Sequence, residues 1–161
     1  MTLPNLGLVV PPGDGRAYYL GSDLYVFKAI GAETGEAYAL CEVTVEPQSG
    51  TPFHRHSRED EAFYVQVGEL QFQLEDQTVV ATAGTFLYSP KGQAHQFTNQ
   101  TATAAKLLIW VTPAGFERFI AEVGQTVAPV QVGATLSPAD VDNILVTASR
   151  YGIEILPPPT P

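Results

Sequence analysis

The chain has 161 residues, which is the size of one ordinary domain with a core of its own. Hydrophobic residues make up 45% of it and charged residues 16%, a composition that excludes a disordered chain. Seventeen acidic and eight basic side chains leave a net charge of −9, so nucleic acid and anionic membranes are not expected as partners.

The chain from Leu6 to Thr112 consists of short runs rich in Val, Tyr, Phe, Thr and Leu, separated by Gly, Pro, Asn and Asp. This pattern is typical of antiparallel strands that close into a sandwich or barrel, and no helical periodicity interrupts it. We therefore predict an all-β fold. The predicted strands are Arg16–Leu20, Leu24–Ile30, Ala37–Val45, Glu61–Val67, Glu69–Leu74, Gln77–Ala81, Thr85–Tyr88, His95–Asn99 and Ala105–Val111.

The pattern changes at Thr112, where a first short helix is predicted. Thr112 can cap the helix, Pro113 suits its first position, and Gly124 offers a left-handed end. Apolar residues at 116, 119, 120 and 123 recur at helical spacing.

A second helix is predicted after a loop around Val127 to Leu136. Ser137 can cap it, Asp140 stands where a capping box has Glu, and Gly152 ends it. Both helices have an apolar stripe, and the simplest expectation is that they pack on the outside of the same barrel or of a partner's. The whole chain, 1–161, is thus expected to form one domain, with the barrel over about 16–112 and a helical extension over about 113–161.

The chain's single cysteine, Cys41, excludes a disulfide within one chain. It lies in the apolar run YALCEVTV, so we expect a small buried side chain rather than a reactive thiol. No segment approaches the ~20 apolar residues that a membrane span requires, and MTLPNLGLVVPPGDG has no basic region followed by a long apolar run. We expect a cytoplasmic protein without membrane contact.

All three histidines lie in two short stretches, HRHSREDE (54–61) and PKGQAHQFTN (90–99). His54 and His56 are two residues apart, so in an extended strand both imidazoles project from one face and can converge on one ion. His95 would join them from a distant strand. The three imidazoles are therefore candidate metal ligands.

A carboxylate can complete this set, and three acidic residues compete for the role. Glu59 and Asp60 are both possible, but Glu61 alone leads directly into the apolar run EAFYVQVG, so its position is favoured. Three imidazoles and one carboxylate suit one divalent transition metal, Fe, Mn, Ni, Co, Cu or Zn, and are too rich in nitrogen for calcium or magnesium.

Both histidine stretches resemble a known family. HRHSREDEAFYVQVG resembles the first cupin motif, G-x5-H-x-H-x3,4-E-x6-G, and GTFLYSPKGQAHQFTN resembles the second, G-x5-P-x-G-x2-H-x3-N, at every specified position. One departure is that the leading glycine of the first motif falls at Gln48, whereas Gly50 stands two residues later. The resemblance implies a cupin double-stranded β-helix, or jelly-roll, barrel with two short C-terminal α-helices. It also implies that His54, His56, Glu61 and His95 bind the metal.

The resemblance leaves three functions open. The two helices and the closing SRYGIEILPPP resemble bacterial single-domain cupins described as quercetin dioxygenase-like. The favoured expectation is a metal-dependent dioxygenase acting on a small aromatic or enolisable substrate, with Glu61 as general base. The alternatives are a metal-dependent isomerase or lyase on a small sugar or keto acid, and a metal- or ligand-binding protein without turnover. Apolar N-terminal strands and two amphipathic helices also suggest a homodimer.

Overall fold

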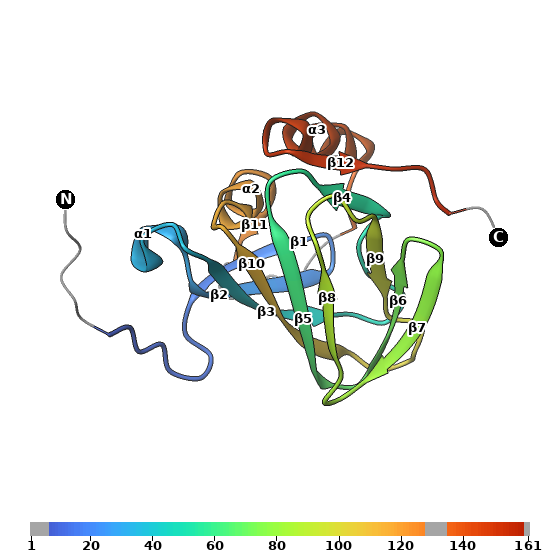
Figure 1. Ribbon diagram of the computed structural model, residues 1–161, viewed down its shortest axis with the longest axis horizontal. Helices are drawn as coiled ribbons and strands as arrows, with labels where there is room; N and C mark the ends of the chain where they lie inside the picture. The colour runs from blue at the N-terminus through green and yellow to red at the C-terminus, as the bar shows by residue number, and fades with distance from the viewer. Residues whose placement is uncertain (1–6, 128–134, 160–161) are drawn as a thin grey trace.

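The computed structural model describes residues 7–127 and 135–159, and it has two antiparallel sheets that face each other (Figure 1). The seven-stranded sheet has the order β11 (Gln125–Thr126), β1 (Arg16–Leu20), β2 (Asp23–Ala29), β3 (Ala39–Val45), β10 (Ala105–Thr112), β5 (Asp60–Val67) and β8 (Phe86–Ser89). The five-stranded sheet has the order β12 (Ile153–Ile155), β4 (His54–His56), β9 (His95–Thr98), β6 (Glu69–Leu74) and β7 (Gln77–Thr82).

The core lies between the two sheets, because alternate residues of each long strand point inward. Burial alternates along the whole of β2 and β3, as expected for strands with one face on a core. The rings of Phe63, Phe72 and Phe97 meet at the centre, and Phe63 contacts Phe72 edge to face at 5.1 Å between ring centroids. Cys41 is buried in this core, as predicted. The all-β fold expected from the sequence is confirmed.

Within the described residues, three short helices accompany the sheets: α1 (Gly31–Thr34), α2 (Phe116–Val123) and α3 (Pro138–Arg150). The predicted capping box of α3 is present, since Ser137 and Asp140 bond reciprocally. The predicted start of α2 is wrong. Thr112 still belongs to β10, where it pairs with Asp60 and its hydroxyl donates to the Ala37 carbonyl, so the helix begins only after Gly115.

Several short elements were not predicted. The four-residue helix α1 and the strands β11 and β12 carry too few residues for a periodic pattern. Of the predicted loop around Val127 to Leu136, residues 128–134 lie outside the described residues. Among the helices that the structure describes, none has the length and apolar character needed to cross a membrane.

The departure at the leading glycine of the first motif has a simple geometric basis. Gln48 itself takes the left-handed conformation, with φ +62°, and its N–H donates to the Asn99 carbonyl. Gly50 is needed for a different reason, because a Cβ there would lie 2.1 Å from the carbonyl oxygen of Phe97. The turn before β4 therefore forms with the glycine two residues later.

Asp23, at the start of β2, makes stability depend on pH. Its side chain is 2% exposed and accepts a hydrogen bond from the Glu46 N–H at 3.0 Å. Burial raises the pKa of Asp23 from 3.8 to about 6, and the hydrogen bonds that favour the carboxylate only partly offset this effect. A raised pKa means that the folded state binds the proton more tightly, so stability is lost as the pH rises through about 6.

We expect Asp23→Asn to stabilise the protein at pH 8 by about 3 kcal/mol and to change little at pH 4, because asparagine keeps the acceptor oxygen and cannot ionise. Urea unfolding of the wild type and the variant at both pH values measures this difference. Asp76→Asn, in an exposed turn, is the matched control for the loss of one acidic side chain. An equal effect of Asp23→Asn at both pH values would contradict the prediction.

Candidate metal centre

The four predicted ligands come from three strands and meet between the two sheets. His54 and His56 lie on β4, and both are buried because they alternate with the exposed Arg55. The direct pairing of His54 with His95 brings β9 to the same place. Glu61 reaches the group from β5, on the opposite sheet. Residues 41 positions apart in the chain thus become neighbours.

The geometry of this cluster is compact. One candidate ligand atom from each of the four residues lies within 4.8 Å of all the others. The Nε2 atom of His95 is 2.8 Å from Glu61 Oε2, and the Nε2 atom of His56 is 3.3 Å from the same oxygen. The structure thus brings the four side chains that were predicted as ligands into one buried cluster.

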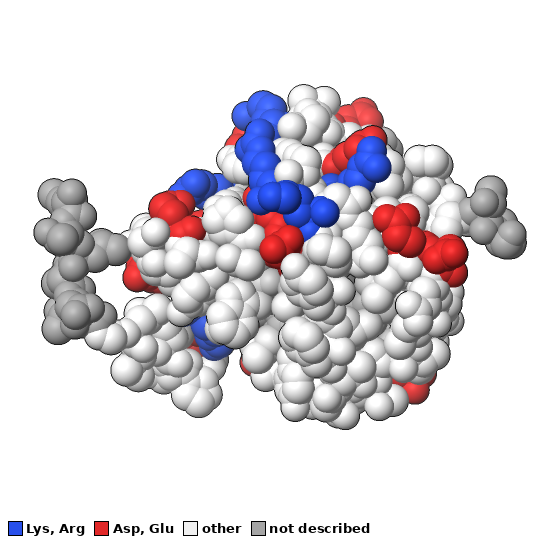
Figure 2. All heavy atoms as spheres, viewed as in Figure 1, with Lys and Arg blue, Asp and Glu red and all other residues white. Residues whose placement is uncertain are grey.

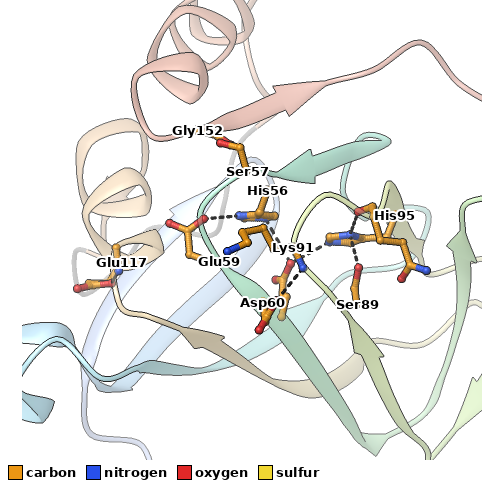
Figure 3. A network of polar contacts seen from close by, with 12 residues as sticks. His56, Ser57, Glu59, Asp60, Ser89, Lys91, His95, Glu117 and Gly152 are labelled. Carbon is orange, nitrogen blue, oxygen red and sulfur yellow. Dashed lines mark hydrogen bonds and ion pairs between the residues drawn. The ribbon is translucent and has the colours of Figure 1, made fainter.

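The other ring nitrogen of each imidazole is held by an acceptor or hydroxyl of the protein. His54 Nδ1 donates to the carbonyl of Pro52 at 2.8 Å, and His56 Nδ1 donates to Glu59 Oε2 at 3.2 Å. His95 Nδ1 lies 2.9 Å from Ser89 Oγ (Figure 3). Contacts of this kind fix the ring orientation of metal-binding histidines, and here they leave the Nε2 atoms of His56 and His95 facing Glu61.

The charges in the cluster favour an anionic carboxylate and a neutral His54. Burial, together with the imidazoles of His95 and His56, lowers the pKa of His54 to about 3. Burial acts to raise the pKa of Glu61, but the charge of His56 and the hydrogen bond from His95 outweigh it and lower that pKa to about 2. Burial lowers the pKa of His56, yet Glu61 and Glu59 raise it above its ordinary value of 6.5.

A buried ring nitrogen within the cluster makes no hydrogen bond, and it points to a metal ion. His56 Nε2 is inaccessible to solvent and makes no hydrogen bond with any residue that the structure describes. An unsatisfied buried nitrogen destabilises a protein by about 1–3 kcal/mol, so such atoms are rare unless something else binds them. An ion bound by three Nε2 atoms and the Glu61 carboxylate would satisfy this nitrogen. The residues therefore fit a divalent transition metal.

The structure also separates the three competing carboxylates. Glu59 is buried but faces the outer side of His56, where it orients the ring through Nδ1. Asp60 accepts a hydrogen bond from the backbone N–H of Lys91 at 2.8 Å, in the turn before β9 (Figure 3). Only Glu61 has its carboxylate among the three imidazoles. Glu59 is thus a supporting residue that the sequence could not distinguish from a ligand.

A small cavity of about 60 Å³ lies beside the cluster and shares His54, Glu61 and His95 as part of its wall. Much of the remaining wall comes from the C-terminal part of the chain. These residues are Phe116, Phe119 and Ile120 of α2, Ile144 of α3, and Ile153 and Ile155 of β12.

This arrangement specifies the place of the two helices, which were expected on the outside of the same barrel or of a partner's. Figure 1 shows α2 and α3 at the end of the barrel where β4 lies. The ring of Phe116 is 5.8 Å from the ring of His56, so α2 reaches the cluster itself. The apolar stripes predicted both helices, but their position over the cavity depends on tertiary packing and was missed.

Comparison with known proteins agrees with the motifs and the fold. Residues 41–112 match the family model for the cupin domain. The chain shows no match to a curated protein.

Solved structures similar to this chain include a predicted oxalate decarboxylase from Thermotoga maritima, which has a TM-score of 0.61 and 19% identity over 65% of this chain and 98% of the other. An RmlC-like cupin from Shewanella frigidimarina has a TM-score of 0.59 and 17% identity over 68% and 94%. A sugar phosphate isomerase from Silicibacter pomeroyi has a TM-score of 0.52 and 22% identity over 63% and 71%. At these identities the likeness concerns the fold.

Proposed function

The chain is a cupin, and we propose that His54, His56, Glu61 and His95 bind one divalent transition-metal ion in a dioxygenase for a small, uncharged aromatic or enolisable substrate. The cupin fold supports several unrelated activities, so the proposal rests on this chain's own site. The observation that carries it is the chemistry of the cavity wall next to the ligand set.

The cavity is apolar and carries no positive side chain. Among the described residues that line it, none is Lys or Arg, and the side chains outside the ligand set that offer a hydrogen bond are the hydroxyls of Tyr25 and Thr51. An anionic sugar phosphate or keto acid would lose its hydration here without gaining a cationic partner from the protein. The wall therefore favours an uncharged, largely apolar substrate.

The size of the cavity limits the substrate further. Pockets that enclose drug-sized ligands measure about 300–1,000 Å³, several times the 60 Å³ found here. A three-ring flavonol would require α2 and α3 to move, whereas a single ring or a short diketone requires much less room. We therefore expect a substrate of single-ring size or smaller.

The residues of the site have separate tasks in this proposal. A bound divalent metal would polarise a substrate oxygen and, when it is redox active, allow reaction with dioxygen. Glu61 is ionised at neutral pH and lines both the cluster and the cavity, so it can accept the proton of a substrate hydroxyl. The apolar side chains of α2 and β12 exclude water from the reacting groups. Both atoms of dioxygen enter the product, so no external reductant is required.

Oxygen uptake by metal-loaded protein tests this function. The full chain is loaded separately with Fe, Mn, Ni, Co, Cu or Zn and mixed with catechol, acetylacetone or quercetin as probes. We expect uptake with at least one redox-active metal and one of the two small probes. Zinc should give none, and quercetin should react more slowly than the small probes because of the cavity size.

Three results would contradict the proposal. If protein that contains one equivalent of metal takes up no oxygen with any metal or probe, the proposed dioxygenase activity is ruled out. Equal conversion of a sugar or keto acid with zinc and with iron, without oxygen, would instead identify an isomerase or lyase. Loading without turnover of either kind of substrate would favour a role in binding alone.

A further inference from the structure

A tyrosine side chain borders the cavity beside the metal centre but has no role yet in the proposed reaction. Tyr25 lies on β2, points into the core and is 3% exposed. Its ring centroid is 6.4 Å from that of Phe116, which is 5.8 Å from that of His56. Phe116 thus connects Tyr25 to the ligand set, and Tyr25 lines the same cavity as Glu61.

The packing of β2 does not explain why this residue is a tyrosine. The next inward residue of the strand, Phe27, has the same 3% exposure, and its ring centroid is 6.5 Å from that of Phe116. On the neighbouring strand, Tyr25 pairs with Val43, which is buried and apolar. A phenylalanine at position 25 would keep the apolar contacts of the ring, so the hydroxyl needs another explanation.

The Tyr25 hydroxyl makes no hydrogen bond with any residue that the structure describes. It is not sealed in the packing as the Nε2 atom of His56 is, because Tyr25 borders the cavity. The other hydroxyl of the cavity wall, on Thr51, already accepts a hydrogen bond from the Phe97 N–H at 3.2 Å. Water can accept the bond that Tyr25 offers, but a substrate that displaces water must bring an acceptor of its own.

This hydroxyl stays protonated at neutral pH. Burial raises the pKa of Tyr25 well above its ordinary value of 10. The charges of Asp23, Cys41 and Glu61 act in the same direction. The cavity therefore contains two groups with different functions, because the ionised Glu61 accepts a proton whereas the neutral phenol of Tyr25 donates a hydrogen bond.

We propose that Tyr25 binds the substrate by donating a hydrogen bond from its hydroxyl to a substrate oxygen that the metal does not hold. This inference rests on the proposed function, in which a first substrate oxygen meets the metal and Glu61 accepts its proton. The substrate then carries a second oxygen for Tyr25, at the part of the cavity that β2 and Phe116 line.

The character of this donor limits the second oxygen to an uncharged one. A carboxylate or phosphate loses a large hydration energy in an apolar cavity, and one neutral hydroxyl offsets little of it. A carbonyl or ether oxygen loses less and needs only one donor. Tyr25 therefore selects, among small uncharged molecules, those that carry a second oxygen over hydrocarbons of the same shape.

Binding of matched ligand pairs to the zinc-loaded full chain tests this inference without turnover. The ligands are 2-, 3- and 4-methoxyphenol, each compared with the ethylphenol of the same substitution pattern, in which a methylene group replaces the ether oxygen. Isothermal titration gives the ratio of the two dissociation constants within each pair. We expect Tyr25→Phe to shift this ratio toward the ethylphenol about 3- to 10-fold for at least one pair, which is the effect of one neutral hydrogen bond.

Tyr64→Phe is the matched control. Tyr64 lies on β5 with its side chain outside the barrel, where it is 45% exposed. Figure 2, in which β5 and β8 lie toward the viewer, shows few charged atoms over these strands, so the loss of an outer hydroxyl there disturbs no cluster of charges. Tyr64→Phe should leave the ratio unchanged for all three pairs.

Stability and zinc content separate a role in binding from a role in folding. Tyr25→Phe should keep about one equivalent of zinc and unfold in urea at no lower concentration than the wild type, because it removes a hydroxyl to which no described residue bonds. A ratio that Tyr25→Phe leaves unchanged for every pair would overturn the inference. So would an equal loss of affinity for both members of each pair, or a loss of stability, since either would show that the hydroxyl serves the fold.

Oxygen uptake decides the proposed function separately. A shifted ratio in a protein that takes up no oxygen would support the role of Tyr25 and contradict the dioxygenase. Uptake combined with an unchanged ratio would support the dioxygenase and contradict the role of Tyr25.

Discussion

Metal-loaded protein is expected to unfold about 10 °C above chelator-treated protein, and His56→Ala is expected to remove this difference. A ligand present at about a thousand times its dissociation constant stabilises the folded state by about 4 kcal/mol. In a chain of this length, each kcal/mol raises Tm by about 2–4 °C. His56 is the most informative position because its Nε2 atom is buried within the cluster and makes no hydrogen bond. Differential scanning calorimetry with cobalt or nickel, with and without EDTA, measures the effect.

Gln96→Ala is the matched control for this experiment. Gln96 is the neighbour of His95 on β9 and points to the opposite side of the strand, so its removal should leave the metal-dependent shift intact. Metal content by elemental analysis should be about one equivalent in the wild type and in Gln96→Ala, and close to zero in His56→Ala. An equal Tm shift in His56→Ala would show that the ion binds elsewhere. The absence of any shift in the wild type would contradict metal binding by this cluster.

The main strands could be predicted from the sequence because each carries enough alternating residues to show a period of two. β1 and β6 have the predicted bounds, and most of the other long strands differ by one or two residues. The histidine cluster could be predicted for a related reason. His54 and His56 lie two apart on one strand, so they share a face whatever the neighbouring strands do.

The features that were missed depend on contacts between distant parts of the chain. Glu59 and Glu61 are both buried acidic residues near the histidines, and only the folded chain shows that Glu59 bonds to the outer nitrogen of His56. The apolar stripe of α2 predicts that the helix packs on a barrel but does not say where. In the structure, Phe116 of this stripe contacts His56. The three residues of β12 give no pattern of their own, and their role comes entirely from their partner β4.

The pairing of β12 with β4 leads to the second large effect, because we expect removal of β12 to weaken metal binding at least tenfold. Strand β4 is only three residues long and carries two of the four clustered side chains. On one side, only His54 pairs with β9, while on the other side all three residues pair with β12. The Leu156 N–H also donates to the Phe53 carbonyl at 2.8 Å. The C-terminal strand therefore fixes much of the position of His54 and His56.

A chain that ends after Tyr151 lacks β12, whereas one that ends after Leu156 keeps it and is the matched control. Isothermal titration with cobalt should show at least tenfold weaker binding by the shorter chain only, because misplaced ligands commonly reduce affinity 10- to 100-fold. The shorter chain also loses the buried side chain of Ile153 together with the strand pairing, so its stability in urea unfolding should fall by more than the about 2–4 kcal/mol expected for that side chain alone.

Point substitutions in β12 separate loss of the strand from general unfolding. Ile153→Ala keeps the backbone pairing but leaves a cavity beside the cluster, so it should destabilise the protein by about 2–4 kcal/mol and weaken cobalt binding. Glu154→Gln breaks the exposed ion pair with Arg55, which should change stability by less than about 1 kcal/mol and leave binding intact. If the chain that ends after Tyr151 folds and binds cobalt as tightly as the full chain, then β5 and β9 suffice to organise the ligands and β12 serves only the cavity wall.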